Sequence, residues 1–100
     1  MHTVPLRKVT IVAEALLEER LMRELRGLGA RGFTVADVRG EGSRGIRAAD
    51  WEGRNVRIET IVSPEAADAI LAHVAEHWFQ HYAVIAWMDD VHVVRGEKYA

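Results

Sequence analysis

The sequence predicts an α+β domain of the ferredoxin-like βαββαβ class, with one long loop between its second and third strands. Three observations lead to this prediction. Four segments have the two-residue alternation or the apolar composition of strands, and two show the apolar spacing of an amphipathic helix. Their order along the chain is strand, helix, strand, strand, helix, strand, which is the split βαβ plan. We therefore expect residues 1–100 to form a single domain, with a modest core that subunit association would help to stabilise.

The first strand and the first helix are predicted in the first third of the chain. Within residues 7–13, Val9, Ile11 and Ala13 alternate with the residues between them, which is the period of a strand. Residues 15–28 form the predicted amphipathic helix, because apolar side chains recur there at helical spacing. These side chains are Leu17, Leu21, Leu25 and Leu28.

A strand–strand–helix–strand segment follows. Residues 33–38 and 56–62 are predicted to pair as a hairpin, because both are strand-like segments and the second alternates with the period of a strand. Ser63 and Pro64 then indicate the start of a helix, since a serine hydroxyl caps free amides and proline fits the first turn. The last strand is predicted over residues 82–94. The apolar stripe of the second helix consists of Ala67, Ile70, Val74 and Trp78.

The predicted last strand is apolar on both faces. Ile85 and Trp87 lie on one face, whereas Val84, Ala86 and Met88 lie on the other. In the split βαβ plan both helices cover the same face of the sheet, so the opposite face needs a different cover. We therefore expect a homo-oligomer, most simply a trimer.

The long loop, at about residues 40–56, is the expected functional element. Connections inside compact domains usually have about 2–6 residues, and longer ones are often functional. From Arg39 to Arg57 the sequence contains five arginines against three acidic residues, although the whole chain has a net charge of −2. The loop is therefore the part of the chain that favours anions.

Individual loop residues suit a phosphate group. The glycines allow the backbone amides around Gly42 to form an anion-binding nest, and the Ser43 hydroxyl adds a donor. Arg44 and Arg47 can each hold phosphate oxygens through charge-assisted hydrogen bonds. A solvated surface loop without a ligand is the alternative interpretation.

The composition argues against several classes of protein. There is no cysteine, so disulfides and thiolate metal sites are excluded. The slightly acidic balance disfavours nucleic acid as a partner, because nucleic-acid binding normally needs a basic face. No apolar run reaches the ~20 residues of a membrane helix, and no nucleophile, base and orienting group form a catalytic set. We expect a cytoplasmic protein that is not an enzyme.

The sequence contains three further motifs. The glycines of residues 40–45 have the spacing of the dinucleotide fingerprint, but no helix is predicted behind them. Residues 31–35 share part of an RNA-binding pattern on the wrong strand of the fold. His73, His77 and His81 recur every four residues on the second helix, so two of them can share a metal ion. An exposed row of histidines near a helix C-terminus is the alternative.

Over residues 8–96 the chain resembles the PII-like signalling proteins, in particular the SbtB-type and carboxysome-associated (CPII) branch. The matching segments are residues 12–14, 32–35 and 40–47, together with Glu59 and residues 82–83. The resemblance implies a homotrimer with an adenine nucleotide in each cleft between subunits. It also implies a mobile T-loop, at about residues 40–56, that holds the phosphates at its base. The implied nucleotide-binding residues are Gly32, Phe33, Thr34, Gly42, Ser43, Arg44, Arg47, Glu59, Ala83 and Val84.

The resemblance also suggests ligands and a role. Val84 stands where related proteins carry a glycine and restricts the approach of a ligand to the backbone, so ADP or AMP is favoured, with ATP and cyclic AMP as further candidates. The CPII branch adds bicarbonate as a candidate second ligand. By T-loop movement the protein would regulate inorganic carbon (bicarbonate) uptake through a bicarbonate transporter, which would recruit it to the membrane. The competing resemblance is a CutA-like trimer that binds divalent metal through the helix histidines.

Overall fold

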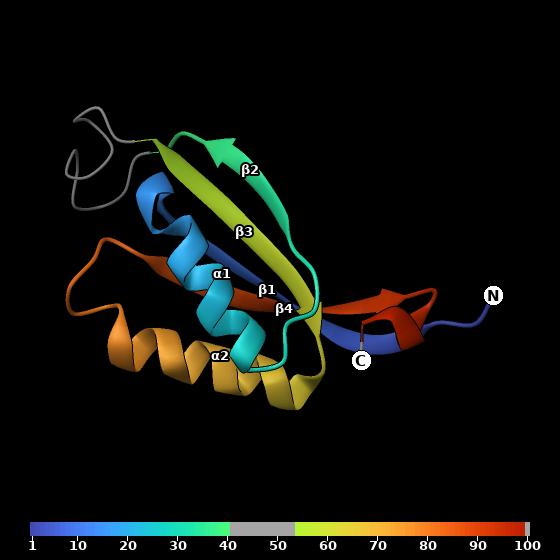
Figure 1. Ribbon diagram of the computed structural model, residues 1–100. Coiled ribbons are helices and arrows are strands. Elements are labelled where there is room, and N and C mark those ends of the chain that lie inside the picture. Colours follow the sequence, from blue (N-terminus) through green and yellow to red (C-terminus); the bar gives the residue numbers. More distant parts are fainter. Residues whose placement is uncertain (41–53, 100) are drawn as a thin grey trace.

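The protein, represented by a computed structural model that describes residues 1–40 and 54–99, is a four-stranded sheet with two helices on one face (Figure 1). Neighbouring strands are antiparallel and have the order β2-β3-β1-β4. The predicted class and the pairing of the second and third strands are confirmed. The elements are β1 (Val4–Glu14), α1 (Glu18–Gly27), β2 (Thr34–Val38), β3 (Asn55–Val62), α2 (Pro64–His77) and β4 (Ile85–Val93).

Local interactions mark the start of α2 and the end of α1. The Ala66 amide donates to Ser63 Oγ at 3.1 Å, and Pro64 occupies the first turn of α2, as predicted. A short 3-10 turn at Ala15–Leu17 precedes α1, so the α-helix begins later than expected. Two residues past the end of α1, Gly29 has a φ of 116°, a conformation that strongly favours glycine.

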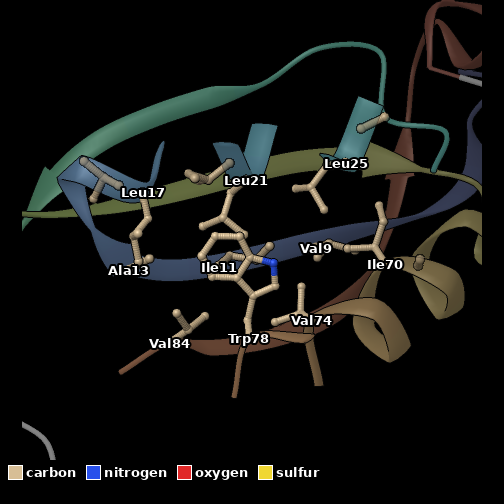
Figure 2. Close-up of a cluster of buried hydrophobic side chains, with 14 of the residues drawn as sticks. Val9, Ile11, Ala13, Leu17, Leu21, Leu25, Ile70, Val74, Trp78 and Val84 are labelled. Atoms are coloured by element: carbon tan, nitrogen blue, oxygen red, sulfur yellow. The ribbon is translucent and has the colours of Figure 1, made fainter. Parts of the chain in front are cut away.

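The core lies between the helices and the sheet. Figure 2 shows side chains of both helices pointing toward those of β1. Both predicted helical stripes are buried, except that Leu28 is only partly buried because α1 ends before it. The ring of Trp78 is completely buried at the end of the α2 stripe. The fully buried side chains include Val9, Ile11, Leu21, Leu25, Ile58, Ile70, Val74 and Trp78.

The last strand begins later than the sequence indicates. Residues 82–84 were expected to belong to it, but β4 begins at Ile85. The Trp78 carbonyl accepts hydrogen bonds from the amides of His81, at 3.1 Å, and Tyr82, at 3.0 Å. These bonds turn the chain after α2, and Val84 then enters the core before the strand begins.

β1 and β4 extend beyond the rest of the sheet at one end. Their pairing continues to Val4 and Val93, whereas the last pair between β1 and β3 joins Arg7 to Val62. The resulting two-stranded ribbon carries both termini (Figure 1). Neither helix in the described part of the chain is long and apolar enough to cross a lipid bilayer.

The opposite end of the sheet is where the candidate site lies. β2 ends there at Val38 and β3 begins there at Asn55, which is its cross-strand partner. The connection from α2 to β4 reaches the same end (Figure 1). We call this the loop end.

Candidate functional site

One row of side chains crosses the sheet on the face turned away from the helices, which we call the open face. Thr34 pairs with Glu59, Glu59 with Thr10, and Thr10 with Trp87. Directly paired residues point to the same face of a sheet. The row therefore places two hydroxyls, a carboxylate and an indole side by side across all four strands.

Two cations flank the carboxylate of this row. Glu59 Oε2 lies 3.3 Å from Arg57 Nε and 3.8 Å from Lys8 Nζ. The Glu59 side chain is 25% exposed, so the cluster is partly shielded from water. Asp89 of β4 is the cross-strand partner of Lys8 on the same face, so this part of the open face holds two positive and two negative groups and has no net formal charge.

The open face has the properties of a surface that is covered in an assembly. Ile85 is 58% exposed and Trp87 is 41% exposed. Within the described residues the buried Thr10 hydroxyl has no hydrogen-bond partner. Large exposed apolar side chains on a contiguous sheet face are typical of an interface with another chain.

Two interactions fix the chain at the loop end. Arg54 Nη1 lies 3.3 Å and 3.2 Å from the two carboxylate oxygens of Asp37. The Ala15 amide donates to the Arg54 carbonyl at 2.6 Å. Residue 54 is thus attached both to β2 and to the end of β1. The predicted phosphate-binding residues Gly42, Ser43, Arg44 and Arg47 lie outside the described residues.

The predicted site residues before and within β2 separate onto different sides of the molecule. The Gly32 carbonyl accepts a hydrogen bond from Thr60 Oγ1 at 2.7 Å. Phe33 packs against the core, and the Arg26 guanidinium lies 5.2 Å from its ring centroid. Thr34 instead pairs with Glu59 on the open face, so one chain brings Thr34 and Glu59 together but leaves Phe33 apart from them.

Ala83 and Val84 lie in the connection from α2 to β4. Ala83 is exposed, whereas Val84 is 7% exposed and belongs to the core. The next residue, Ile85, pairs with Val12, whose other cross-strand partner is Arg57. The connection therefore joins the sheet next to Val12 of β1, which separates it from Arg57 of β3.

A second polar cluster, which the sequence analysis did not find, surrounds Glu24 on the helix side. Its Oε1 lies 2.7 Å from His73 Nε2 and accepts from Trp78 Nε1 at 2.9 Å, while its Oε2 accepts from Arg20 Nε at 3.2 Å. Burial acts to raise the pKa of Glu24, but these hydrogen bonds outweigh it and lower the pKa to about 2. The sequence feature that could have indicated this cluster is Trp78, because a buried indole N–H usually has a hydrogen-bond acceptor.

The helix histidines do not form a three-ligand set. His73 contacts Glu24, and His77 Nε2 lies 3.3 Å from Glu76 Oε1. His81 lies in the turn after α2. Across residues 1–40 and 54–99, no three or more histidine or acidic side chains are grouped so that they could hold a metal ion. The metal-binding alternative therefore depends on His73 and His77 of α2, whose ring centroids are 4.6 Å apart.

Comparisons with known proteins point to one family. The sequence model of the nitrogen regulatory protein P-II family matches residues 6–98. The crystal structure of a protein described as a PII-like signaling protein, from Thermus thermophilus, is 61% identical, with a TM-score of 0.87 and complete coverage of both chains. A search of the curated proteins gave no match.

More distant structures share the fold. CPII from Thiomonas intermedia, bound to ADP and bicarbonate, is 23% identical with a TM-score of 0.85, and the match covers 99% of this chain and 98% of that one. A second structure of CPII, bound to ADP, AMP and acetate, is 22% identical with a TM-score of 0.86, over 99% and 98% of the two chains.

Proposed function

Since the chain belongs to the nitrogen regulatory protein P-II family, we propose that it is a signalling protein that binds an adenine nucleotide, with ADP or AMP favoured. The observation that carries the proposal is the family match, which extends over residues 6–98. Binding of ADP and AMP by CPII, which shares the fold, supports the choice of ligand. The protein acts by changing its contacts with a partner, not by catalysing a reaction.

The nucleotide lies between subunits of a homotrimer. The open face supports this arrangement, because Ile85 and Trp87 expose apolar surface that a second copy would cover. A second copy also supplies what a single chain lacks, since Phe33 and Thr34 lie on different sides of one molecule. Residues from two chains then complete each cleft.

Each proposed site residue has a role that its chemistry allows. Ser43, Arg44 and Arg47 hold the phosphates, and Gly42 allows the backbone to approach them. Thr34 and Glu59 line the cleft from the open face. Gly32, Phe33, Ala83 and Val84 supply its walls, Val84 through its backbone because its side chain belongs to the core. A residue other than glycine at this position restricts the approach of a ligand to the backbone and favours ADP or AMP over ATP.

The second ligand is bicarbonate, and the regulated process is inorganic carbon uptake. Bicarbonate is bound in a CPII structure with the same fold. We propose that the nucleotide selects one of two conformations of the segment between β2 and β3. The shift in this equilibrium equals the difference in the nucleotide's binding free energy for the two conformations. That segment then engages or releases a bicarbonate transporter at the cytoplasmic side of the membrane.

Calorimetric titration tests the nucleotide site. The purified protein is titrated with AMP, ADP, ATP and cyclic AMP, each with and without bicarbonate. We expect ADP or AMP to bind at one site per chain and Arg44→Ala to weaken binding about 10- to 150-fold, since a hydrogen bond to a charged group contributes ~1.5–3 kcal/mol. Arg23→Ala is the matched control, because Arg23 is an exposed arginine on α1.

Two results would contradict the proposal. No heat with any nucleotide would remove the nucleotide-binding function, and equal affinity in Arg44→Ala would remove the phosphate site. In the first case zinc and copper titrations follow, with His77→Ala as the comparison. Loss of metal binding in that variant would support the CutA-like alternative.

A further inference from the structure

A closed ring of contacts joins α1 to the residues that follow α2. Arg20 Nε donates to Glu24 Oε2 at 3.2 Å, and Arg20 Nη1 donates to the Tyr82 hydroxyl at 3.3 Å. Trp78 Nε1 donates to Glu24 Oε1 at 2.9 Å, and the Trp78 and Tyr82 ring centroids are 4.9 Å apart. The Arg20 guanidinium also lies 4.5 Å from the Trp78 ring centroid. We call these four residues the Arg20–Tyr82 network.

Trp78 is the fixed point of this network. Its side chain is fully buried, and buried side chains in a close-packed core have little freedom to shift. Its carbonyl accepts the Tyr82 amide at 3.0 Å. Tyr82 is therefore attached to Trp78 by both its backbone and its ring, and to α1 by its hydroxyl.

The network ends one residue before the connection that the proposed function uses. Tyr82 precedes Ala83, which is exposed, and Val84, which is buried in the core. Ile85 then pairs with Val12 as the first residue of β4. The exposed Ala83 is thus held on one side by Tyr82 and on the other by Val84, and its position depends on both.

The contacts of Arg20 are better suited to positioning than to global stability. Its side chain is 49% exposed, and an exposed i,i+4 pair such as Arg20–Glu24 adds little to folding. The contacts with Tyr82 and Trp78 join α1 to a segment far along the chain. A planar guanidinium that stacks on one ring and donates to a neighbouring hydroxyl fixes direction as well as distance.

We propose that Arg20 and Tyr82 are positioning residues for the adenine nucleotide site, acting through Ala83. This inference rests on the proposed function. Tyr82, held by Arg20 and Trp78, sets the place of the Ala83 backbone at the loop end, where the nucleotide is bound. Loss of the hydroxyl or of the guanidinium removes the attachment of Tyr82 to α1 and leaves only its contacts with Trp78, so part of the binding free energy is spent on ordering the connection.

The test compares ADP affinity in three variants with their stability. Tyr82→Phe removes only the hydroxyl, Arg20→Gln removes the guanidinium, and the third variant combines both changes. We expect each single variant to weaken ADP binding about 3- to 10-fold in calorimetry while the urea midpoint changes little. The double variant should bind ADP no more weakly than the single variant with the lower affinity, because both changes remove the same hydrogen bond.

Two controls separate positioning from a general structural effect. Arg23→Gln, an exposed arginine on the same helix, should bind ADP like the unaltered chain. Arg20→Lys keeps a charged donor and should recover part of the lost affinity. If Arg20→Gln lowers the urea midpoint, Tyr82→Phe decides alone, because it retains the ring against Trp78.

The outcomes distinguish this inference from the function on which it rests. If the unaltered chain binds ADP and Tyr82→Phe binds it equally well, the positioning role is wrong and the proposed function stands. Additive losses in the double variant would also overturn the role. If the unaltered chain binds no adenine nucleotide, the proposed function fails and this inference fails with it.

Discussion

Replacing Glu24 by glutamine should remove a pH-dependent part of the folding free energy. The Glu24 carboxylate receives hydrogen bonds from Trp78 and Arg20 and lies against His73. Glutamine has the same shape but no charge and does not titrate. The folding free energies of the two proteins should therefore differ most at pH values where the Glu24 carboxyl is ionised. They should differ least at pH values where it is protonated in both the folded and the unfolded chain.

The magnitude follows from the pKa of this carboxyl. In the folded protein it falls from its ordinary value of 4.5 to about 2. A folded-state pKa below the unfolded one adds stability above the unfolded pKa, and this stability is lost as the pH falls through the folded pKa. At about 1.4 kcal/mol per pKa unit, the contribution present near pH 5 is about 3 kcal/mol and is almost gone at pH 2.

Urea unfolding at pH 5, 4, 3 and 2 measures this contribution, at one protein concentration because association shifts apparent stability. The stability difference between the unaltered chain and Glu24→Gln should shrink by about 3 kcal/mol between pH 5 and pH 2. Glu19→Gln is the matched control, since Glu19 is exposed on the same helix, and its effect should stay within about 0.5 kcal/mol. A difference that is constant across this pH range would refute the role given to the Glu24 cluster.

Three further substitutions have defined outcomes, each measured by urea unfolding. Gly96→Ala should destabilise by about 1–3 kcal/mol, because a Cβ there would lie 2.7 Å from Val4 Cγ2; an unchanged midpoint would show that the C-terminal turn does not pack on β1. Arg95→Gly should stabilise by up to about 1 kcal/mol, since Arg95 has a φ of 75° that glycine adopts without strain; a loss of stability would mean that the arginine side chain matters more than its backbone. Thr60→Val should cost about 1 kcal/mol, the usual net contribution of a hydrogen bond, because it removes the bond to the Gly32 carbonyl. Thr3→Val, near the N-terminal end of the chain, is a control for the change of side chain, and an equal effect in both would contradict that assignment.

The sequence predicted the fold because its local signals agree with one another. Val9, Ile11 and Ala13 alternate as a strand and are buried as one. Ser63 and Pro64 indicate a helix start, and the hydroxyl of Ser63 caps α2. The boundaries of β4 were wrong because Tyr82 and Val84 suit a strand by composition. The carbonyl of Trp78 turns the chain there, and no local pattern encodes that bond.

The candidate site was less accessible to prediction, because it depends on residues that only the sheet register brings together. Glu59 was predicted, but its contact with Lys8 follows from the pairing of β1 with β3, whereas Arg57 lies two residues away on the same face of β3. The Glu24 cluster was missed for a similar reason, since Glu24 and Trp78 lie far apart in the sequence and meet only when the helices pack. A charged side chain in an amphipathic helix is predicted to be exposed to solvent unless the position of its partner in the fold is known.

The central position of β1 has a consequence for the order in which the protein can fold. β1 is made first during synthesis, but its two partners are β3 and β4, and Val4 pairs with Val93 near the other end of the chain. One edge of β1 thus stays unpaired until β3 has been made, and the other edge until β4 has been made. Long-range pairing of this kind slows folding, and unpaired strand edges favour aggregation. We therefore expect truncation before β4 to leave a chain that cannot fold, rather than a shorter stable domain.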